Sequence, residues 1–314
     1  KYDRDNKVKL RDVLFLTHPK PADAEREALY RRIAERTLTT PDTWEVALSA
    51  GGDKKTTWER LISEQKLGPL AFLRNLRNMR EAGVDRPSIQ AGFAQLKSQW
   101  LLPLNFLNAY RENPEFVREI EQMMFRMFAP LPKLAGHTVF VVDVSGSMWA
   151  PISGKSKLTR QDVASAMAVF AGEMCEHITI YATAGNDGDS VHATAKIVPH
   201  RGFALLDEIE KWRHTLGGGG IFTRQCLEWI AKDLGGEKPA RIIVFSDSQD
   251  CDHNKRLPQP FGEHNYIVDV SAHARGVNYE GVWTAEISGW SEHFLTYIAA
   301  LEGLHLPEGE TAGH

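Results

Sequence analysis

An apolar run at residues 137–144 (HTVFVVDV) is the feature that most constrains the fold of this chain. The run is rich in β-branched residues and shows no polar alternation, which favours a strand that is buried on both faces of a parallel sheet. A loop rich in Gly and Ser follows the run, and an amphipathic segment at 159–175 follows the loop. This succession predicts a strand, a loop and a helix, the repeating unit of an α/β fold.

The rest of the C-terminal half continues the same alternation. Further strands are expected at 178–184, 191–198, 241–246, 265–270 and 282–287, and further helices at 202–214, 223–234 and 291–301. Alternating strands and helices indicate a doubly wound, mostly parallel sheet. In such sheets ligands bind outside the carboxyl ends of the strands.

The half before residue 130 has helical spacing throughout. Helices are expected at 22–37, 69–82, 87–99, 101–111 and 114–128, with one more that begins with Thr40 as cap and Pro41 in its first turn, and another that begins with a capping box of Thr56 and Glu59. Short helices with tight connections indicate stacked helical pairs, as in HEAT-like repeats. The character changes at residues 130–132, so we predict a helical domain at 1–132, an α/β domain at 133–305 and a tail at 306–314.

The two halves carry opposite net charge. Residues 1–135 have 23 Lys and Arg against 18 Asp and Glu, or +5, and the remainder has 14 against 23, or −9. A basic half suits a polyanionic partner, and an acidic half suits a metal ion. No apolar stretch approaches the roughly 20 residues that cross a bilayer, and no secretory signal precedes the first helix, so we expect a soluble cytoplasmic protein without a membrane partner.

Three polar side chains lie at the end of the buried run at 137–144 and just after it. Asp143, Ser145 and Ser147 form a DxSxS segment where the strand gives way to a loop. Oxygen ligands favour a hard cation, so the segment predicts a site for Mg²⁺, or for Mn²⁺ or Ca²⁺. The alternative is that these residues only shape a tight turn and cap the next helix.

The DxSxS segment resembles the metal-ion-dependent adhesion site of von Willebrand factor type A domains. The resemblance implies two further ligands, a Thr after a Gly-rich loop and an Asp at the end of a later strand. Thr223, after the glycines at 217–220, and Asp247 stand at those positions, although Ile221 and Phe222 replace two glycines that are usual in the family. It also implies a protein partner whose acidic side chain completes the coordination of the metal.

Residues 1–21 (KYDRDNKVKLRDVLFLTHPKP) and 70–79 (LAFLRNLRNM), upstream of a type A domain, resemble the TROVE module of the Ro ribonucleoprotein family. The resemblance implies helical repeats that bind noncoding RNA, both Y RNAs and the single-stranded ends of misfolded RNA. The family's module is longer than the helical part of this chain. The resemblance therefore implies that the chain is a fragment or that a separate chain supplies the remaining N-terminal repeats.

The RNA-binding residues that the resemblance implies lie near the N-terminus. His18 matches the His of the family's Leu-Ser/Thr-His motif, and Arg11 stands where the family has a basic residue on its Y RNA surface. Lys9 belongs to the same cationic stretch. Arg74 and Arg77, close to Asn75 and Asn78, lie opposite the leucines of a helix and could also bind phosphate. The alternatives are a solvated helix face for the arginines and a core position for His18.

Known catalytic motifs do not occur in the sequence. It contains no GxxxxGK[ST] phosphate loop and no GxSxG nucleophile motif, and its candidate metal site has too few acids for two-metal hydrolysis. We therefore expect an RNA-binding scaffold and not an enzyme. The alternative is a metal-dependent protein-binding module that does not have RNA as its main ligand.

Overall fold

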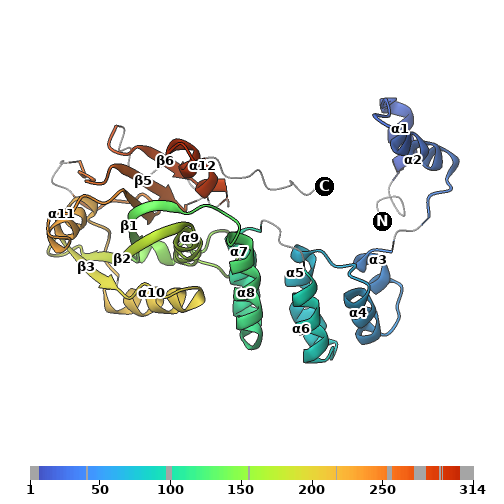
Figure 1. The fold of residues 1–314 in the computed structure, drawn as a ribbon, viewed down its shortest axis with the longest axis horizontal. Helices are drawn as coiled ribbons and strands as arrows, with labels where there is room; N and C mark the ends of the chain where they lie inside the picture. The colour runs from blue at the N-terminus through green and yellow to red at the C-terminus, as the bar shows by residue number, and fades with distance from the viewer. Residues whose placement is uncertain are drawn as a thin grey trace. The chain divides into compact units, whose positions relative to one another are not determined.

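The computed structural model describes residues 7–39, 42–96, 101–154, 156–216, 218–252, 257–271, 281–289, 291 and 293–304. They form two compact units, one of Lys1–Gly68 with Arg77–Gln95 and the other of Pro69–Leu76 with Leu96–His314. Among the described residues, only helices precede the first strand, and an α/β sheet follows, as Figure 1 shows. The predicted fold class is confirmed.

The first unit is helical. Its helices are α1 (Leu10–Thr17), α2 (Ala24–Glu35), α3 (Trp44–Ser49), α4 (Lys54–Ser63) and α6 (Arg86–Gln95), and α5 (Pro69–Glu81) contributes to both units. Trp58 and Leu61 of α4 and Ile89 of α6 are buried, and the Trp58 ring stacks on Trp44 at 6.3 Å. In α1 and α2, which are described over their full lengths, no residue is fully buried.

One predicted helix start in this unit was wrong, and one helix was not predicted. The sequence analysis assigned no structure to the segment at 10–17, which forms α1. Asp53 caps α4 by accepting a hydrogen bond from the backbone N–H of Thr56 at 2.8 Å, so Thr56 lies inside the helix and makes no capping box with Glu59. Helix α3 begins after Thr43, and the predicted start at residues 40 and 41 lies outside the described residues.

The second unit contains a sheet of six strands within the described residues. The strands are β1 (Leu134–Asp143), β2 (Cys175–Asn186), β3 (Val191–Ile197), β4 (Arg241–Ser246), β5 (His264–Asp269) and β6 (Ala285–Ser288). Their order is β3-β2-β1-β4-β5-β6, and every neighbouring pair is parallel except β2 and β3. The central pair, β1 and β4, consists almost entirely of buried residues, as the apolar run in β1 predicts.

Helices cover both faces of this sheet (Figure 1). They are α9 (Arg160–Met174), α10 (Phe203–Thr215), α11 (Thr223–Asp233) and α12 (His293–Leu301), while α7 (Pro103–Glu112) and α8 (Val117–Phe128) pack on α9. Val139 and Val141 of β1 pack with Leu227 of α11 on one face. On the other face Phe245 of β4 packs edge-on against Phe294 of α12. Within the described ranges, no helix is long and apolar enough to span a lipid bilayer.

Helix α9 is buried on nearly all sides. It lies against the sheet and also packs on α7, α8 and α10. Its Phe170 ring contacts Phe106 of α7 at 5.6 Å and Phe128 of α8 at 5.1 Å between ring centroids. A helix enclosed in this way is buried around its whole circumference, so the prediction of an amphipathic segment at 159–175 was wrong. Helices α7 and α8 thus belong to the same compact unit as the sheet, while the domain limits at 132 and 305 remain predictions.

A buried ion pair closes the end of the sheet where β4 begins. Arg241 of β4 bonds to Glu302, just after α12, with 2.6 Å between Nη2 and Oε2. The side chains of Arg241 and Glu302 are 3% and 6% exposed. Arg241 also donates to Thr138 Oγ1 of β1, and the Tyr266 hydroxyl of β5 donates to Glu302. The pair therefore ties α12 to three strands.

Candidate functional site

The DxSxS segment lies at the carboxyl ends of the two central strands. Strand β1 ends at Asp143, and a short 3-10 helix, η2 (Gly146–Trp149), follows it. Strand β4 ends at Ser246, directly before Asp247. Since β1 and β4 are parallel neighbours, their carboxyl ends meet at the same edge, and the side chains of Asp143, Ser145 and Asp247 are all buried there. The fold thus places these residues where doubly wound sheets bind ligands.

Hydrogen bonds fix the carboxylate of Asp143. Its Oδ1 accepts from the backbone N–H of Ser145 at 2.8 Å, and its Oδ2 accepts from the Ser246 hydroxyl at 2.7 Å. The hydroxyl oxygens of Ser145 and Ser147 lie 3.2 Å apart. Neighbouring ligands around an octahedral Mg²⁺ lie about 3 Å apart, because each is about 2.1 Å from the ion. The oxygen donors and the spacing of the two hydroxyls therefore fit a small hard cation.

Burial makes the charged form of Asp143 unfavourable. It raises the pKa of this carboxyl from 3.8 to about 7, the hydrogen bond from Ser246 opposes that shift, and the negative charge of Asp247 adds to it. The positive charge of a divalent cation would offset both the cost of burying the Asp143 carboxylate and its repulsion by Asp247. The cation would bind the deprotonated form of this carboxyl. The electrostatics of Asp143 therefore also suit a cation.

Asp247 has a cationic partner that the sequence analysis did not identify. Its Oδ2 accepts from Arg160 Nη1 at 2.5 Å, and the side chains of Asp247 and Arg160 are 0% and 10% exposed. The same nitrogen lies 3.4 Å from the backbone oxygen of Ser147. Arg160 is the first residue of α9, where the helix dipole disfavours a positive charge. That unfavourable position was the one signal in the sequence that could have singled it out.

Thr223 is the first residue of α11 and is buried. The Gly-rich loop before it contacts the DxSxS segment, because the Gly146 N–H donates to the backbone oxygen of Gly219 at 3.2 Å. The backbone N–H of Thr223 donates to Asp250 Oδ1 at 3.4 Å. The structure therefore brings the loop of Thr223 to the segment, and the role of its hydroxyl as a ligand remains a prediction.

The acidic residues around the Gly-rich loop have structural partners. Asp187 is exposed and accepts from the Gly220 N–H at 2.7 Å. The side chain of Asp252 is only 3% exposed and pairs with Arg224 at 3.0 Å. In the part of the chain that the structure describes, no three His, Cys, Asp or Glu side chains gather as a metal site. A cation at the DxSxS segment would therefore depend on the serine hydroxyls.

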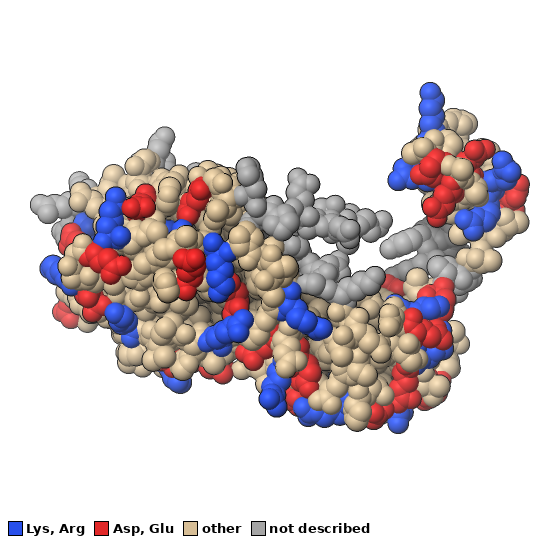
Figure 2. Space-filling model, viewed as in Figure 1, with Lys and Arg blue, Asp and Glu red and all other residues tan. Residues whose placement is uncertain are grey.

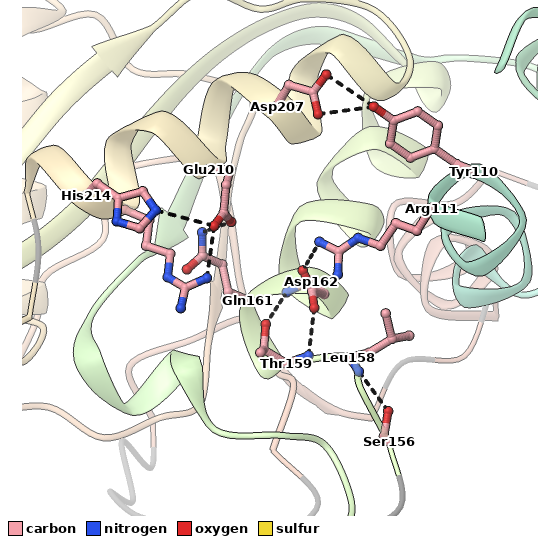
Figure 3. Close-up of polar contacts among 11 residues, drawn as sticks. Tyr110, Arg111, Ser156, Leu158, Thr159, Gln161, Asp162, Asp207, Glu210 and His214 are labelled. Carbon is pink, nitrogen blue, oxygen red and sulfur yellow. Dashed lines mark hydrogen bonds and ion pairs between the residues drawn. The ribbon is translucent and has the colours of Figure 1, made fainter. Parts of the chain in front are cut away.

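Helix α7 reaches the first turn of α9 through polar side chains (Figure 3). Arg111 forms an ion pair with Asp162, whose carboxylate also accepts from the backbone N–H of Thr159 at 2.7 Å and completes a capping box. The Tyr110 ring stacks on Phe203 of α10, with 4.5 Å between their centroids. The contacts of Arg111 and Thr159 with Asp162 hold the turn from which Arg160 extends to Asp247.

The N-terminal candidates for RNA binding lie on α1 and at its ends. Lys9 is the N-cap residue, and its backbone N–H donates to Asp12 Oδ2 at 2.8 Å. The guanidinium of Arg11 lies over the Phe15 ring at 5.1 Å. His18 ends the helix in the left-handed region with φ 42° and is exposed, so it is not a core histidine. The structure thus places these three candidates within one short helix and its caps.

The second pair of candidates lies on α5. Arg74 and Arg77 are both exposed, and Arg77 Nε lies 3.5 Å from Glu81 Oε1. Asn75 was expected to lie beside them, but it is buried and donates to the backbone oxygen of Ala71. On the face that Figure 2 shows, basic and acidic side chains are interspersed. The exposed arginines are therefore accessible, but acidic neighbours accompany them.

Known proteins match parts of this chain. Residues 19–171 match the family model of the TROVE domain, a range that extends into α9. Telomerase protein component 1 of Mus musculus is 31% identical over 101 residues, which are 30% of this chain and 4% of that protein. Its counterpart in Rattus norvegicus is 34% identical over 79 residues, which are 23% and 3%. The chain thus spans only a few per cent of these curated relatives.

A solved structure shares the fold. The Deinococcus radiodurans RO (RSR) protein superposes with a TM-score of 0.53 at 17% sequence identity, over 96% of this chain and 72% of that one. This likeness extends over both the helices and the sheet.

Proposed function

Because residues 19–171 match the TROVE domain, we propose that this chain is a Ro-like protein and an RNA-binding scaffold of a ribonucleoprotein. The match of residues 19–171 to the TROVE domain is the observation that carries the proposal. The ligand is noncoding RNA, either Y RNA-like or the single-stranded ends of misfolded RNA. In this proposal the protein binds RNA in the cytoplasm and catalyses no reaction.

The helical half provides the RNA contacts in this proposal. The contacting side chains are Lys9, Arg11, His18, Arg74 and Arg77. Their exposure or closeness to the surface of α1 and α5, and the net charge of +5 over residues 1–135, support this assignment. Arginine suits the role because its planar group donates to phosphate and stacks on bases.

The α/β half holds a divalent cation, most suitably Mg²⁺, in this proposal. Asp143, Ser145 and Ser147 would hold it, with Thr223 and Asp247 completing the set. When bound, the cation offers a coordination position to an acidic side chain of a protein partner. The geometry of the DxSxS segment equally supports the second candidate function, a metal-dependent protein-binding module without RNA as its main ligand.

Binding of RNA at several salt concentrations tests the first function. Each phosphate contact on a single strand contributes about 0.7 to the slope of log affinity against log salt. Replacing Lys9, Arg11, Arg74 and Arg77 by Gln should weaken binding and make the slope shallower by up to about 0.7 per lost contact. Filter binding of a single-stranded RNA measures both quantities.

A matched control removes the same charge elsewhere. The variant in which Lys54, Lys211, Lys232 and Lys238, all exposed, are replaced by Gln should bind RNA nearly as well as the unmodified chain. Asp143→Ala should also leave RNA affinity largely intact. An equal loss of RNA affinity in the control would show that the effect comes from net charge alone. A loss of RNA affinity in Asp143→Ala would place the RNA at the metal centre.

A further inference from the structure

Arg160 places a positive charge inside the candidate metal centre. Its guanidinium bonds to Asp247 and lies within 3.4 Å of the Ser147 backbone oxygen, and both Asp247 and Ser147 belong to the proposed ligand set. We infer that Arg160 competes with the divalent cation for this centre and sets its affinity. The inference rests on the metal centre of the proposed function.

The position of Arg160 is unfavourable for a positive charge unless the negative charge of Asp247 compensates for it. As the first residue of α9 it lies at the positive end of the helix dipole. Its side chain is nearly buried, and burying a guanidinium is costly unless an acid neutralises it. Asp247 is the acid that does so, which makes the pair a built part of the site.

The backbone of Arg160 is held in place. Its N–H donates to the backbone oxygen of Ala150 at 3.0 Å, just after η2. The capping box of Thr159 and Asp162 fixes the helix start, and Arg111 of α7 pairs with Asp162 (Figure 3). Since the helix start is fixed, only the flexible side chain of Arg160 is free to move when a cation enters.

The two acids of the centre differ in their partners. Asp143 is held by the neutral groups of Ser145 and Ser246, whereas Asp247 is held by the guanidinium of Arg160. A divalent ion at Asp143 therefore meets the like charge of Arg160 in the same crevice. Either Arg160 releases Asp247 or the ion binds without that acid, and both outcomes weaken metal binding. Arg160 thus keeps the centre neutralised at low metal concentration.

Direct titration of Mn²⁺ into the full chain tests this inference, with calorimetry as the readout. Arg160→Gln should bind Mn²⁺ about tenfold or more tightly than the unmodified chain, because removing one like charge from a crevice changes affinity by at least that order. Arg160→Lys keeps the charge and should stay close to the unmodified chain. Asp143→Ala should not bind the ion.

The outcomes separate this inference from the proposed function. Equal or weaker binding by Arg160→Gln, with Mn²⁺ binding by the unmodified chain intact and lost in Asp143→Ala, would overturn the competition and leave the metal centre in place. Binding by none of the chains would overturn the metal centre and the competition together. Binding only by Arg160→Gln would support the competition in its strongest form.

A second measurement does not depend on the folding of Arg160→Gln. In the unmodified chain labelled with ¹⁵N-arginine, Mg²⁺ should change the guanidinium resonances of Arg160, which Arg160→Lys assigns. Those of Arg241, which pairs with Glu302 at the opposite end of β4, should stay unchanged. An Arg160 signal that does not respond while the amides of Ser145 and Ser147 shift would overturn the inference.

Discussion

Replacing Asp143 by Asn should stabilise the metal-free protein at pH 8. The Asp143 side chain is fully buried, and the two groups that hydrogen-bond to it can bond equally well to an amide. The Asn oxygen can accept from the Ser145 N–H, and its NH₂ can donate to the Ser246 hydroxyl, which then acts as acceptor. The substitution thus removes a buried charge and keeps its hydrogen bonds.

The size of this effect follows from the pKa of Asp143. Burial raises that pKa in the folded protein from 3.8 to about 7. The stability linked to this carboxyl is fully present below pH 3.8 and is lost as the pH rises through about 7. A pKa difference of about 3 corresponds to about 4 kcal/mol. The free energy of unfolding of Asp143→Asn should therefore exceed that of the unmodified chain by up to about 4 kcal/mol at pH 8 and by almost nothing below pH 4.

Metal should narrow this difference in stability. A ligand that binds only the folded state at a hundredfold excess over Kd adds about 2.7 kcal/mol to its stability. Mg²⁺ should therefore stabilise the unmodified chain and leave Asp143→Asn unchanged.

Urea unfolding at pH 4 to 8, with chelator and with Mg²⁺, measures these differences. Asp189→Asn, at an exposed loop position, controls for the loss of one carboxylate. A metal-free Asp143→Asn that is less stable than the unmodified chain at pH 8 would refute the burial argument. Equal stabilisation of both chains by Mg²⁺ would refute Asp143 as a ligand.

Two further predictions concern the packing around the site and the sheet. Gly146→Ala should lower the free energy of unfolding by about 1–3 kcal/mol, because its Cβ would lie 2.7 Å from a backbone oxygen of the Gly-rich loop. Gly154→Ala, with no atom within 4 Å of its Cβ, should have little effect in the same urea titration. Glu302→Gln should lower the free energy of unfolding by about 3–5 kcal/mol, because it leaves Arg241 buried without its acid. Glu59→Gln, which breaks a largely exposed pair with Lys55, should lower it by at most about 1 kcal/mol. Equal losses of stability in the two variants would contradict the role of burial.

Local patterns in the sequence were sufficient to predict the sheet and the DxSxS geometry. The run at 137–144 indicates a strand buried on both faces, because its residues 139–142 are apolar without interruption. Asp143, Ser145 and Ser147 are two residues apart, so one turn brings them together. Asp247 was predicted from the resemblance to von Willebrand type A domains, and the parallel pairing of β1 and β4 brings it to the same edge as Asp143.

Packing between distant segments determined the remaining features of the site. Arg160 and Asp247 are 87 residues apart, and no local pattern links them. The burial of Asp252 depends on the side chain of Arg224, and the burial of Asn75 depends on the packing around α5. Charge and polarity alone predict solvated positions for such residues, because the cost of burying them is offset only by partners that the fold supplies.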